Sequence, residues 1–338
     1  MEGATKNFKA KDFLINNGII VVLVFIALFT GIRQPTFFSS GNLVNVIMNV
    51  APRFIVACGV SGCLITKGTD LSAGRMVGLS ACIAGTLLQK ADYSGKFWPN
   101  LPNFGAWWIL VVLLICIAVC MVFGFINGLV VSYLQVPAFI ATLGMQLIVY
   151  GVCLVYTDAT PIGGYRSDYT EVAKQLRFGG SKVGIPYLFL IALVVGIIIW
   201  FVYNQMTHGK YMYAIGGNEQ AAEVSGVNTK KTKIIIYVTA AALYALGGFL
   251  FGAKSGGTSV NMGQGYELEA IAACTIGGVS VNGGIGRVSG VLIGVLVFEL
   301  LKTCMQYLGV NTNYQYIVQG IVLVTAIALD IRKYIAKK

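Results

Sequence analysis

The residues that could carry out chemistry are few and stand at the edges of apolar runs. Asp70, Ser72 and Arg75 follow one such run, and Glu267 and Glu269 open another. If these runs cross a membrane, each charge near the centre costs about 3 kcal/mol, so a charge that is kept there is typical of a substrate or ion path. We therefore predict that Asp70, Ser72 and Arg75 lie at or near such a path. Glu267 and Glu269 are expected near the outer face, in contact with a partner or with water.

Asp70 has a second interpretation, as the cap of a helix. Thr69 or Asp70 can N-cap a helix that begins near Leu71. The segment near 66–72 is then a break between two helices, and a second glycine-rich break is expected at 277–286. Such breaks are tolerated in a membrane where they are buried in protein or line a cavity. Asp70 thus fits either role, as the N-cap of the following helix or as a residue on the substrate path.

Catalytic motifs are absent or unsupported. Gly59-Val60-Ser61-Gly62 matches the short GxSG of intramembrane serine proteases, but such a serine needs a base within the membrane. The single histidine, His208, lies in a polar stretch. No HExxH, paired-aspartate or P-loop motif occurs, so we predict no catalytic residue, no metal site and no ATP hydrolysis by this chain. The eight cysteines lie almost entirely in apolar segments without CxxC pairs and are interpreted as small hydrophobic residues.

Composition decides the class of protein. Apolar residues are 57% of the 338 and charged residues only 11%, whereas a soluble domain carries about 25% charged residues. The net charge of +11 could suggest nucleic acid, but the positive residues stand between apolar runs and form no basic face interleaved with aromatic residues. We predict an all-α, polytopic membrane protein, one domain over 1–338, that binds no nucleic acid.

The apolar runs give about ten candidate membrane spans, since about 20 apolar residues cross a bilayer. They are 14–31, 43–66, 71–89, 107–133, 138–156, 185–203, 234–252, 267–280, 287–306 and 313–331. Pro52 and Arg53 interrupt the second run, and the eighth is short. Glu299 and Lys302, three residues apart in the ninth, are expected to neutralise each other. Small residues four apart, such as the glycines in GxxxG, predict close helix contacts in several runs.

A polar stretch at 204–233 is expected in the cytoplasm. Lysine and arginine in short loops set the orientation, and ten spans with the N-terminus inside place this stretch and both termini there. Its middle is predicted to be a short helix that Asn218 N-caps and Gly226 ends in a left-handed turn. Between those ends Ala221, Ala222 and Ser225 are small, Glu219 and Glu223 suit the positive N-terminal half of the helix, and Val224 is the only larger apolar residue. So short a helix must be docked, either on its own membrane domain or in a groove of a soluble partner.

Four segments together carry a resemblance to a known family. They are GTDLSAG (68–74), AIGGNEQAAEVSGVN (214–228), YELEAIAAC (266–274) and GGVSVNGGIG (277–286), in this order. Over nearly its whole length the chain resembles the membrane-spanning permease subunits of bacterial ABC-type sugar importers, in the branch that handles ribose, galactose and methyl-galactoside. Thr69, Ala73 and the run Arg75-Met76-Val77-Gly78-Leu79 are most similar to the galactose/methyl-galactoside permeases.

The resemblance implies a coupling site. Such permeases carry a cytoplasmic E-A-A-x-x-x-G loop whose short helix docks into an ATPase subunit. Here Ala221, Ala222 and Gly226 match the pattern, Gln220 stands where the glutamate is usual, and Glu219 comes one place earlier. We therefore expect the coupling residues to be Glu219, Gln220, Ala221, Ala222, Glu223 and Gly226. ATP and Mg²⁺ would bind to the partner subunit, with no cofactor held by this chain.

The resemblance also implies partners and a mechanism. They are a second copy of the permease in a homodimer, two cytoplasmic ABC ATPase subunits, and a periplasmic or lipid-anchored sugar-binding protein that Glu267 and Glu269 are expected to contact. Sugar would cross the bacterial inner membrane by alternating access. The expected substrate is galactose or methyl-galactoside, with ribose as an alternative. The alternative from another class is a stand-alone secondary carrier, which would usually keep ion-coupling carboxylates deep in its spans.

Overall fold

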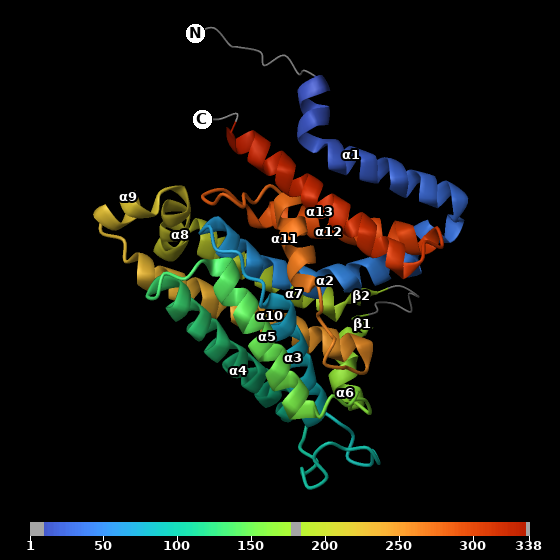
Figure 1. The fold of residues 1–338 in the computed structure, drawn as a ribbon. Coiled ribbons are helices and arrows are strands. Elements are labelled where there is room, and N and C mark those ends of the chain that lie inside the picture. The colour runs from blue at the N-terminus through green and yellow to red at the C-terminus, as the bar shows by residue number, and fades with distance from the viewer. Residues whose placement is uncertain (1–9, 177–183, 336–338) are drawn as a thin grey trace.

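The apolar runs fold into helices, because a chain in lipid must satisfy its backbone hydrogen bonds internally. A computed structural model describes residues 10–176 and 184–335, and most of them are helical (Figure 1). The longer helices are α1 (Ala10–Arg33), α2 (Ser40–Ile65), α3 (Ala73–Leu87), α4 (Trp107–Ser132), α5 (Ala138–Thr157), α7 (Tyr187–Asn204), α8 (Thr207–Gly217), α10 (Thr229–Ser255), α11 (Tyr266–Ile276), α12 (Val288–Tyr307) and α13 (Thr312–Ile335). The short elements are η1 (Pro35–Phe38), α6 (Ser167–Thr170), η2 (Glu171–Ala173), α9 (Glu219–Val224) and the antiparallel pair β1 (Gln175–Leu176) and β2 (Ile185–Pro186).

Seven helices in the described part of the chain are long and apolar enough to cross a membrane: α2, α4, α5, α7, α10, α12 and α13. This confirms the prediction of an all-α polytopic membrane protein. Each of the ten predicted spans contains a helix, but the count of about ten is not confirmed. The helix α3 has 15 residues and α11 has 11, and the apolar part of α1 is only Val21–Arg33. A bilayer core needs about 20 residues of helix.

Both predicted breaks occur. The first lies between the end of α2 at Ile65 and the start of α3 at Ala73, and the second between α11 and α12. The predicted cap is wrong in its position, because α3 begins two residues after Leu71. The carboxylate of Asp70 accepts the backbone N–H of Ser72 at 3.0 Å, which forms a turn ahead of the helix in place of a cap on it.

The central layer consists of α2, α3 and α10, in which α10 packs against both α2 and α3. Of the apolar stretches in α2 and α10, 67% of the residues are buried, against 22% in α4, α5 and α7. Those peripheral helices present Leu, Ile, Val and Phe side chains outward, as a lipid-facing surface requires. Polar groups within the central layer are therefore enclosed by protein, and the candidate site is found among them.

Glycines let the backbones of neighbouring helices approach closely. A Cβ at Gly124 of α4 would collide with the backbone of Tyr237 in α10. On α12, a Cβ at Gly290 would collide with the backbone of Gly277, and one at Gly294 with the carbonyl oxygen of Ala273. The GxxxG patterns thus mark helix contacts, as predicted.

Replacing Gly294 with alanine is expected to lower the melting temperature of the purified protein in mild detergent. The added methyl group has no room against Ala273, and overpacking of this kind costs about 1–3 kcal/mol. Gly320→Ala in α13 is the matched control, because nothing lies within 4 Å of a Cβ there. Equal melting temperatures for the two variants would contradict the close contact between α11 and α12.

Candidate functional site

The caps predicted for the short helix at 219–226 are present in α9. The side chain of Asn218 accepts the backbone N–H of Ala221 at 3.1 Å. Gly226 has φ = +87°, and the following N–H of Val227 donates to the carbonyl of Ala222 at 3.0 Å. These local hydrogen bonds fix where the helix begins and ends, which is why sequence alone could place it.

One face of α9 is anchored on its own chain. Ala222 is buried in a small apolar cluster with Ile215 of α8 and Val227. The carboxylate of Glu219 lies 2.6 Å from Nζ of Lys233 in α10, so this acid already has a cationic partner. Docking of this face on the chain's own membrane domain is confirmed, whereas docking in a groove of a soluble partner stays a prediction. Ala222 belongs to the anchored face, although the sequence analysis grouped it with a face offered to a partner.

The other face of α9 is exposed. Gln220, Ala221 and Glu223 are all accessible, and Val224 is 90% exposed. Figure 1 shows α8 and α9 projecting from the bundle on the side away from the loop between α3 and α4. The exposed side chain of Val224 and the small side chain of Ala221 next to it form a surface that could contact a partner.

A polar cleft of about 830 Å³ separates α9 from the first break. Its walls include Lys67 beside the break, Gln135 between α4 and α5, and Lys230 of α10. The hydroxyl of Tyr237, which also lines the cleft, is buried next to Gly68 and has no hydrogen-bond partner in the described residues. The cleft thus reaches from the exposed helix to Gly68, two residues before Asp70.

That cluster is built around Asp70, which is 1% exposed. Its Oδ1 accepts the hydroxyl of Ser72 at 2.6 Å, and its Oδ2 accepts the hydroxyl of Tyr244 in α10 at 3.2 Å. The amide of Asn127 in α4 donates to Ser72 Oγ at 3.0 Å. A chain of four buried polar side chains therefore joins the first break to α4 and α10. In a low dielectric, such bonds hold their partners firmly.

The break is held from a third side by α5. Thr142 Oγ1 accepts the backbone N–H of Leu71 at 3.0 Å and lies 3.1 Å from the carbonyl of Thr69. Arg75, in contrast, does not join Asp70. Its guanidinium donates to the carbonyl of Val260 at 3.2 Å and stacks 4.1 Å from the ring centre of Tyr150. Of the three predicted path residues, the structure brings together only Asp70 and Ser72.

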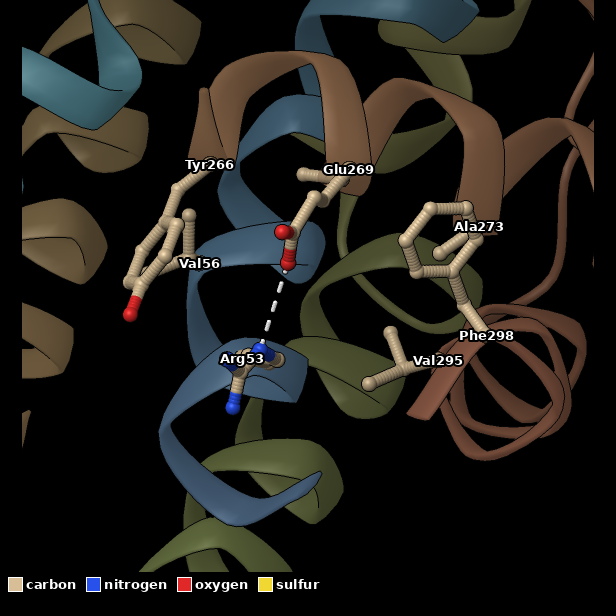
Figure 2. Close-up of a pocket in the computed structure, with 8 residues that line it drawn as sticks. Arg53, Val56, Tyr266, Glu269, Ala273, Val295 and Phe298 are labelled. Atoms are coloured by element: carbon tan, nitrogen blue, oxygen red, sulfur yellow. Dashed lines mark hydrogen bonds and ion pairs between the residues drawn. The ribbon is translucent and has the colours of Figure 1, made fainter. Parts of the chain in front are cut away.

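A second buried cluster is ionic and centres on Arg53 in the middle of α2. Figure 2 shows Glu269 reaching from α11 toward Arg53, with 3.3 Å between Nε and Oε2. Arg53 Nη1 also lies 3.4 Å from Glu299 of α12, and Lys302 Nζ lies 2.7 Å from Glu269. The expected pairing of Glu299 with Lys302 is wrong, because both side chains have partners on other helices.

The ionic cluster leaves almost no free space. A cavity of about 20 Å³ beside Arg53, Tyr266 and Glu269 has room for a single water molecule. Arg53 also lies 5.4 Å from the ring centre of Phe251 and 5.2 Å from that of Tyr266, within cation–π range. The cluster joins helices and has no volume for a sugar.

Glu267 and Glu269 do not present carboxylates to the outside in this conformation. Glu267 is 5% exposed, and the side chain of Glu269 is 15% exposed and engaged by two cations. The contact of these residues with an external binding protein stays a prediction.

The serine of the GxSG match has local partners. The hydroxyl of Ser61 donates to the carbonyl of Cys58 at 2.7 Å and lies 3.2 Å from the hydroxyl of Tyr203. His208 stands on α8, where burial lowers the pKa of its imidazole and favours the neutral form. Among the described residues, no group of three His, Cys, Asp or Glu side chains is placed to hold a metal ion.

Sequence reasoning missed several members of the two clusters. Asn127 and Thr142 stand within long apolar helices, where a lone polar residue is a usable signal. Arg53 was noticed only as an interruption of its span, although a charge inside a run needs a partner. Tyr244 had no such signal, because tyrosine also fits an apolar core.

Comparison with known proteins places these features in a family. The family described as branched-chain amino acid transport system / permease component matches residues 42–327. The galactose/methyl galactoside import permease of Escherichia coli (strain K12) is 42% identical over 329 residues, 96% of this chain and 97% of the relative. The corresponding permease of Haemophilus influenzae (strain ATCC 51907 / DSM 11121 / KW20 / Rd) is 41% identical over 100% of both chains. The ribose import permease of E. coli (strain K12) is 34% identical over 97% of each. No solved structure matches the chain at a significant level.

Proposed function

The chain belongs to this permease family, and from that premise we propose that it is the membrane permease of an ATP-driven sugar importer in the bacterial inner membrane. The observation that carries the proposal is the full-length similarity to import permeases for galactose and methyl galactoside, which exceeds that to the ribose permeases. Galactose or methyl galactoside is therefore the proposed substrate, with ribose second. The proposed partners are a cytoplasmic ATPase, which binds ATP and Mg²⁺, an external sugar-binding protein and a second copy of the permease.

The geometry of α9 supports docking to the ATPase. Its anchored face, through Ala222 and Glu219, ties the helix to α8 and α10. Its exposed face offers Ala221, Glu223 and Val224 to a groove on the partner. A docked helix that is fixed to the bundle can pass on the movement of the ATPase when ATP binds, as alternating access requires. We call α9 the coupling helix from here on.

The polar cluster at the first break supports a path for sugar. Asp70, Ser72 and Asn127 are the kinds of groups that exchange hydrogen bonds with hydroxyls. Asp70 and Ser72 lie where the backbone is not helical, and Asn127 reaches them from α4. In this conformation they are bonded to one another and buried, so the path there is closed. Arg75 faces the loop that precedes α11 and lies outside this cluster.

Replacing Val224 with aspartate is expected to abolish co-purification of the ATPase subunit from native membranes. Val224 is 90% exposed, so the change should leave the fold intact while placing a charge in the proposed interface. ATP-dependent uptake of labelled galactose should fall with it, by about tenfold or more, since buried like or unpaired charges cost several kcal/mol at interfaces. Co-purification and uptake are measured on the same membranes.

The control is Asn103→Asp, in the exposed loop between α3 and α4 at the far end of the molecule. It adds the same charge away from the coupling helix and should retain both the ATPase and uptake. Wild-type protein that purifies alone and transports galactose without ATP would instead establish a secondary carrier. Asp70 would then be the residue to examine, because it is a buried carboxylate with no cation among its hydrogen-bond partners.

A further inference from the structure

Three backbone segments from distant parts of the chain meet at the end of α8, next to the coupling helix. They are 65–67 at the end of α2, 216–217 at the end of α8, and 283–284 in the second break. The backbone N–H of Gly284 donates to the carbonyl of Ile65 at 2.8 Å. The ammonium group of Lys67 donates a hydrogen bond to the carbonyl of Gly217, with 3.4 Å between Nζ and the oxygen. We call these three segments together the glycine junction.

The junction depends on direct contact between backbones. A Cβ at Gly216 would collide with the carbonyl oxygen of Ile65 and with the backbone of Gly284. Gly283 and Gly284 have φ values of +83° and +74°, which L side chains rarely adopt. The side chain of Lys67 runs along one edge of the junction, but Gly216 contacts Ile65 and Gly284 through backbone atoms. A shift of α8 therefore bears directly on the backbone of both.

The coupling helix and α8 are joined well enough to move together. Ala222 of the coupling helix packs against Ile215 of α8, one residue before the junction. The hydroxyl of Tyr213, also on α8, donates to the carbonyl of Gly286 in the second break at 2.9 Å. A force on the exposed face of the coupling helix thus has a short route to the second break, within two turns of α8.

The two breaks connect the junction to different parts of the molecule. The first leads within a few residues to Asp70 and Ser72, the centre of the buried polar cluster. Near Gly68 this break contacts the hydroxyl of Tyr237 in α10, which has no hydrogen-bond partner among the described residues. The second break is tied to α13 through Asp330, which accepts from Ser280 Oγ at 3.0 Å and the N–H of Val281 at 3.1 Å.

We propose that the glycine junction transmits the movement of the coupling helix to both breaks at once, and that Gly216 is the positioning residue on which this transmission depends. The inference rests on the proposed function, since it needs an ATPase that moves the coupling helix. It goes beyond that function by assigning the mechanical link to named backbone contacts outside the ATPase interface. Because Gly216 contacts Ile65 and Gly284 through backbone atoms, one methyl group added at Gly216 would push α8 away from both breaks.

Gly216→Ala and Gly217→Ala form a matched pair that tests the proposal. The two positions are adjacent at the end of α8, but nothing lies within 4 Å of a Cβ at Gly217. Each variant is purified as the complete complex with its ATPase and reconstituted with the binding protein, and sugar transported per ATP hydrolysed is measured. Gly216→Ala is expected to keep the ATPase bound and active while this ratio falls about tenfold, within the usual range of coupling between sites. Gly217→Ala should match the wild type.

Tyr213→Phe provides a second test that does not depend on tolerance of a clash. It removes the hydroxyl that bonds to Gly286 and leaves the ring in place, and the ratio of sugar to ATP is expected to fall about threefold, as loss of one hydrogen bond predicts. An unchanged ratio in an assembled Gly216→Ala complex would overturn the proposal. If that variant fails to assemble, an unchanged ratio in Tyr213→Phe overturns it. Wild-type protein without any ATPase would refute the proposed function itself.

Discussion

Arg53→Met is expected to be among the most destabilising single substitutions in this chain. Arg53 is the ion-pair partner of Glu299, whose side chain is only 4% exposed, and one of two partners of Glu269. Removing one member of a buried pair leaves an uncompensated charge and costs about 3–5 kcal/mol. Methionine keeps the unbranched apolar stem but is shorter than arginine, so adding Glu299→Gln separates the loss of charge from the loss of volume. The measurement is the melting temperature of the purified protein in mild detergent.

Two further variants identify which acid causes the loss. Adding Glu299→Gln to Arg53→Met is expected to recover much of the stability, because it neutralises the carboxylate that was left alone. Lys302→Met is the comparison, and it should cost less, since Glu269 keeps Arg53 as a partner at 3.3 Å. A melting temperature for Arg53→Met equal to that of the wild type would show that the ionic cluster does not hold α2, α11 and α12 together.

Arg53 also shows where sequence reasoning stopped. The sequence marks it as a charge inside an apolar run, but its partner Glu269 stands 216 residues away. The choice of partner depends on how α2, α11 and α12 pack, and no local pattern encodes that. The expected pair of Glu299 with Lys302 had the correct helical spacing and failed for the same reason. A local pair in an exposed helix gains only about 0.2–0.5 kcal/mol, so a buried tertiary partner overrides it.

The coupling helix was predictable to the extent that its determinants are local. Asn218 and Gly226 lie within a few residues of the groups they cap, so the ends of the helix followed from sequence. Its orientation did not, because the burial of Ala222 depends on contacts with Ile215 and Val227. The lengths of α3 and α11 were unpredictable for a related reason. Both adjoin glycine-rich breaks, whose ends are fixed by contacts such as that of Thr142 with Leu71.

Asp70→Ala is expected to abolish sugar uptake and to lower stability. The carboxylate accepts hydrogen bonds from the N–H and hydroxyl of Ser72 and from the hydroxyl of Tyr244, all in a buried site. Alanine leaves these donors unpaired, at about 1–3 kcal/mol for each buried group. Because the same groups line the proposed path, their rearrangement should also disturb the passage of sugar. Uptake of labelled galactose and the melting temperature are measured on the same preparations.

Asp70→Asn separates the two roles of this residue. Asparagine keeps the size and one acceptor oxygen, so the fold should be largely retained. If the negative charge serves transport, uptake stays low in the folded variant; if Asp70 acts only by holding the break, uptake returns with stability. Arg75→Met is the companion test, because Arg75 faces Val260 and Tyr150 and not the polar cluster. Uptake that is unchanged with alanine at Asp70, Ser72 and Arg75 together would remove all three from the path, and would direct attention to the polar cleft beside the coupling helix.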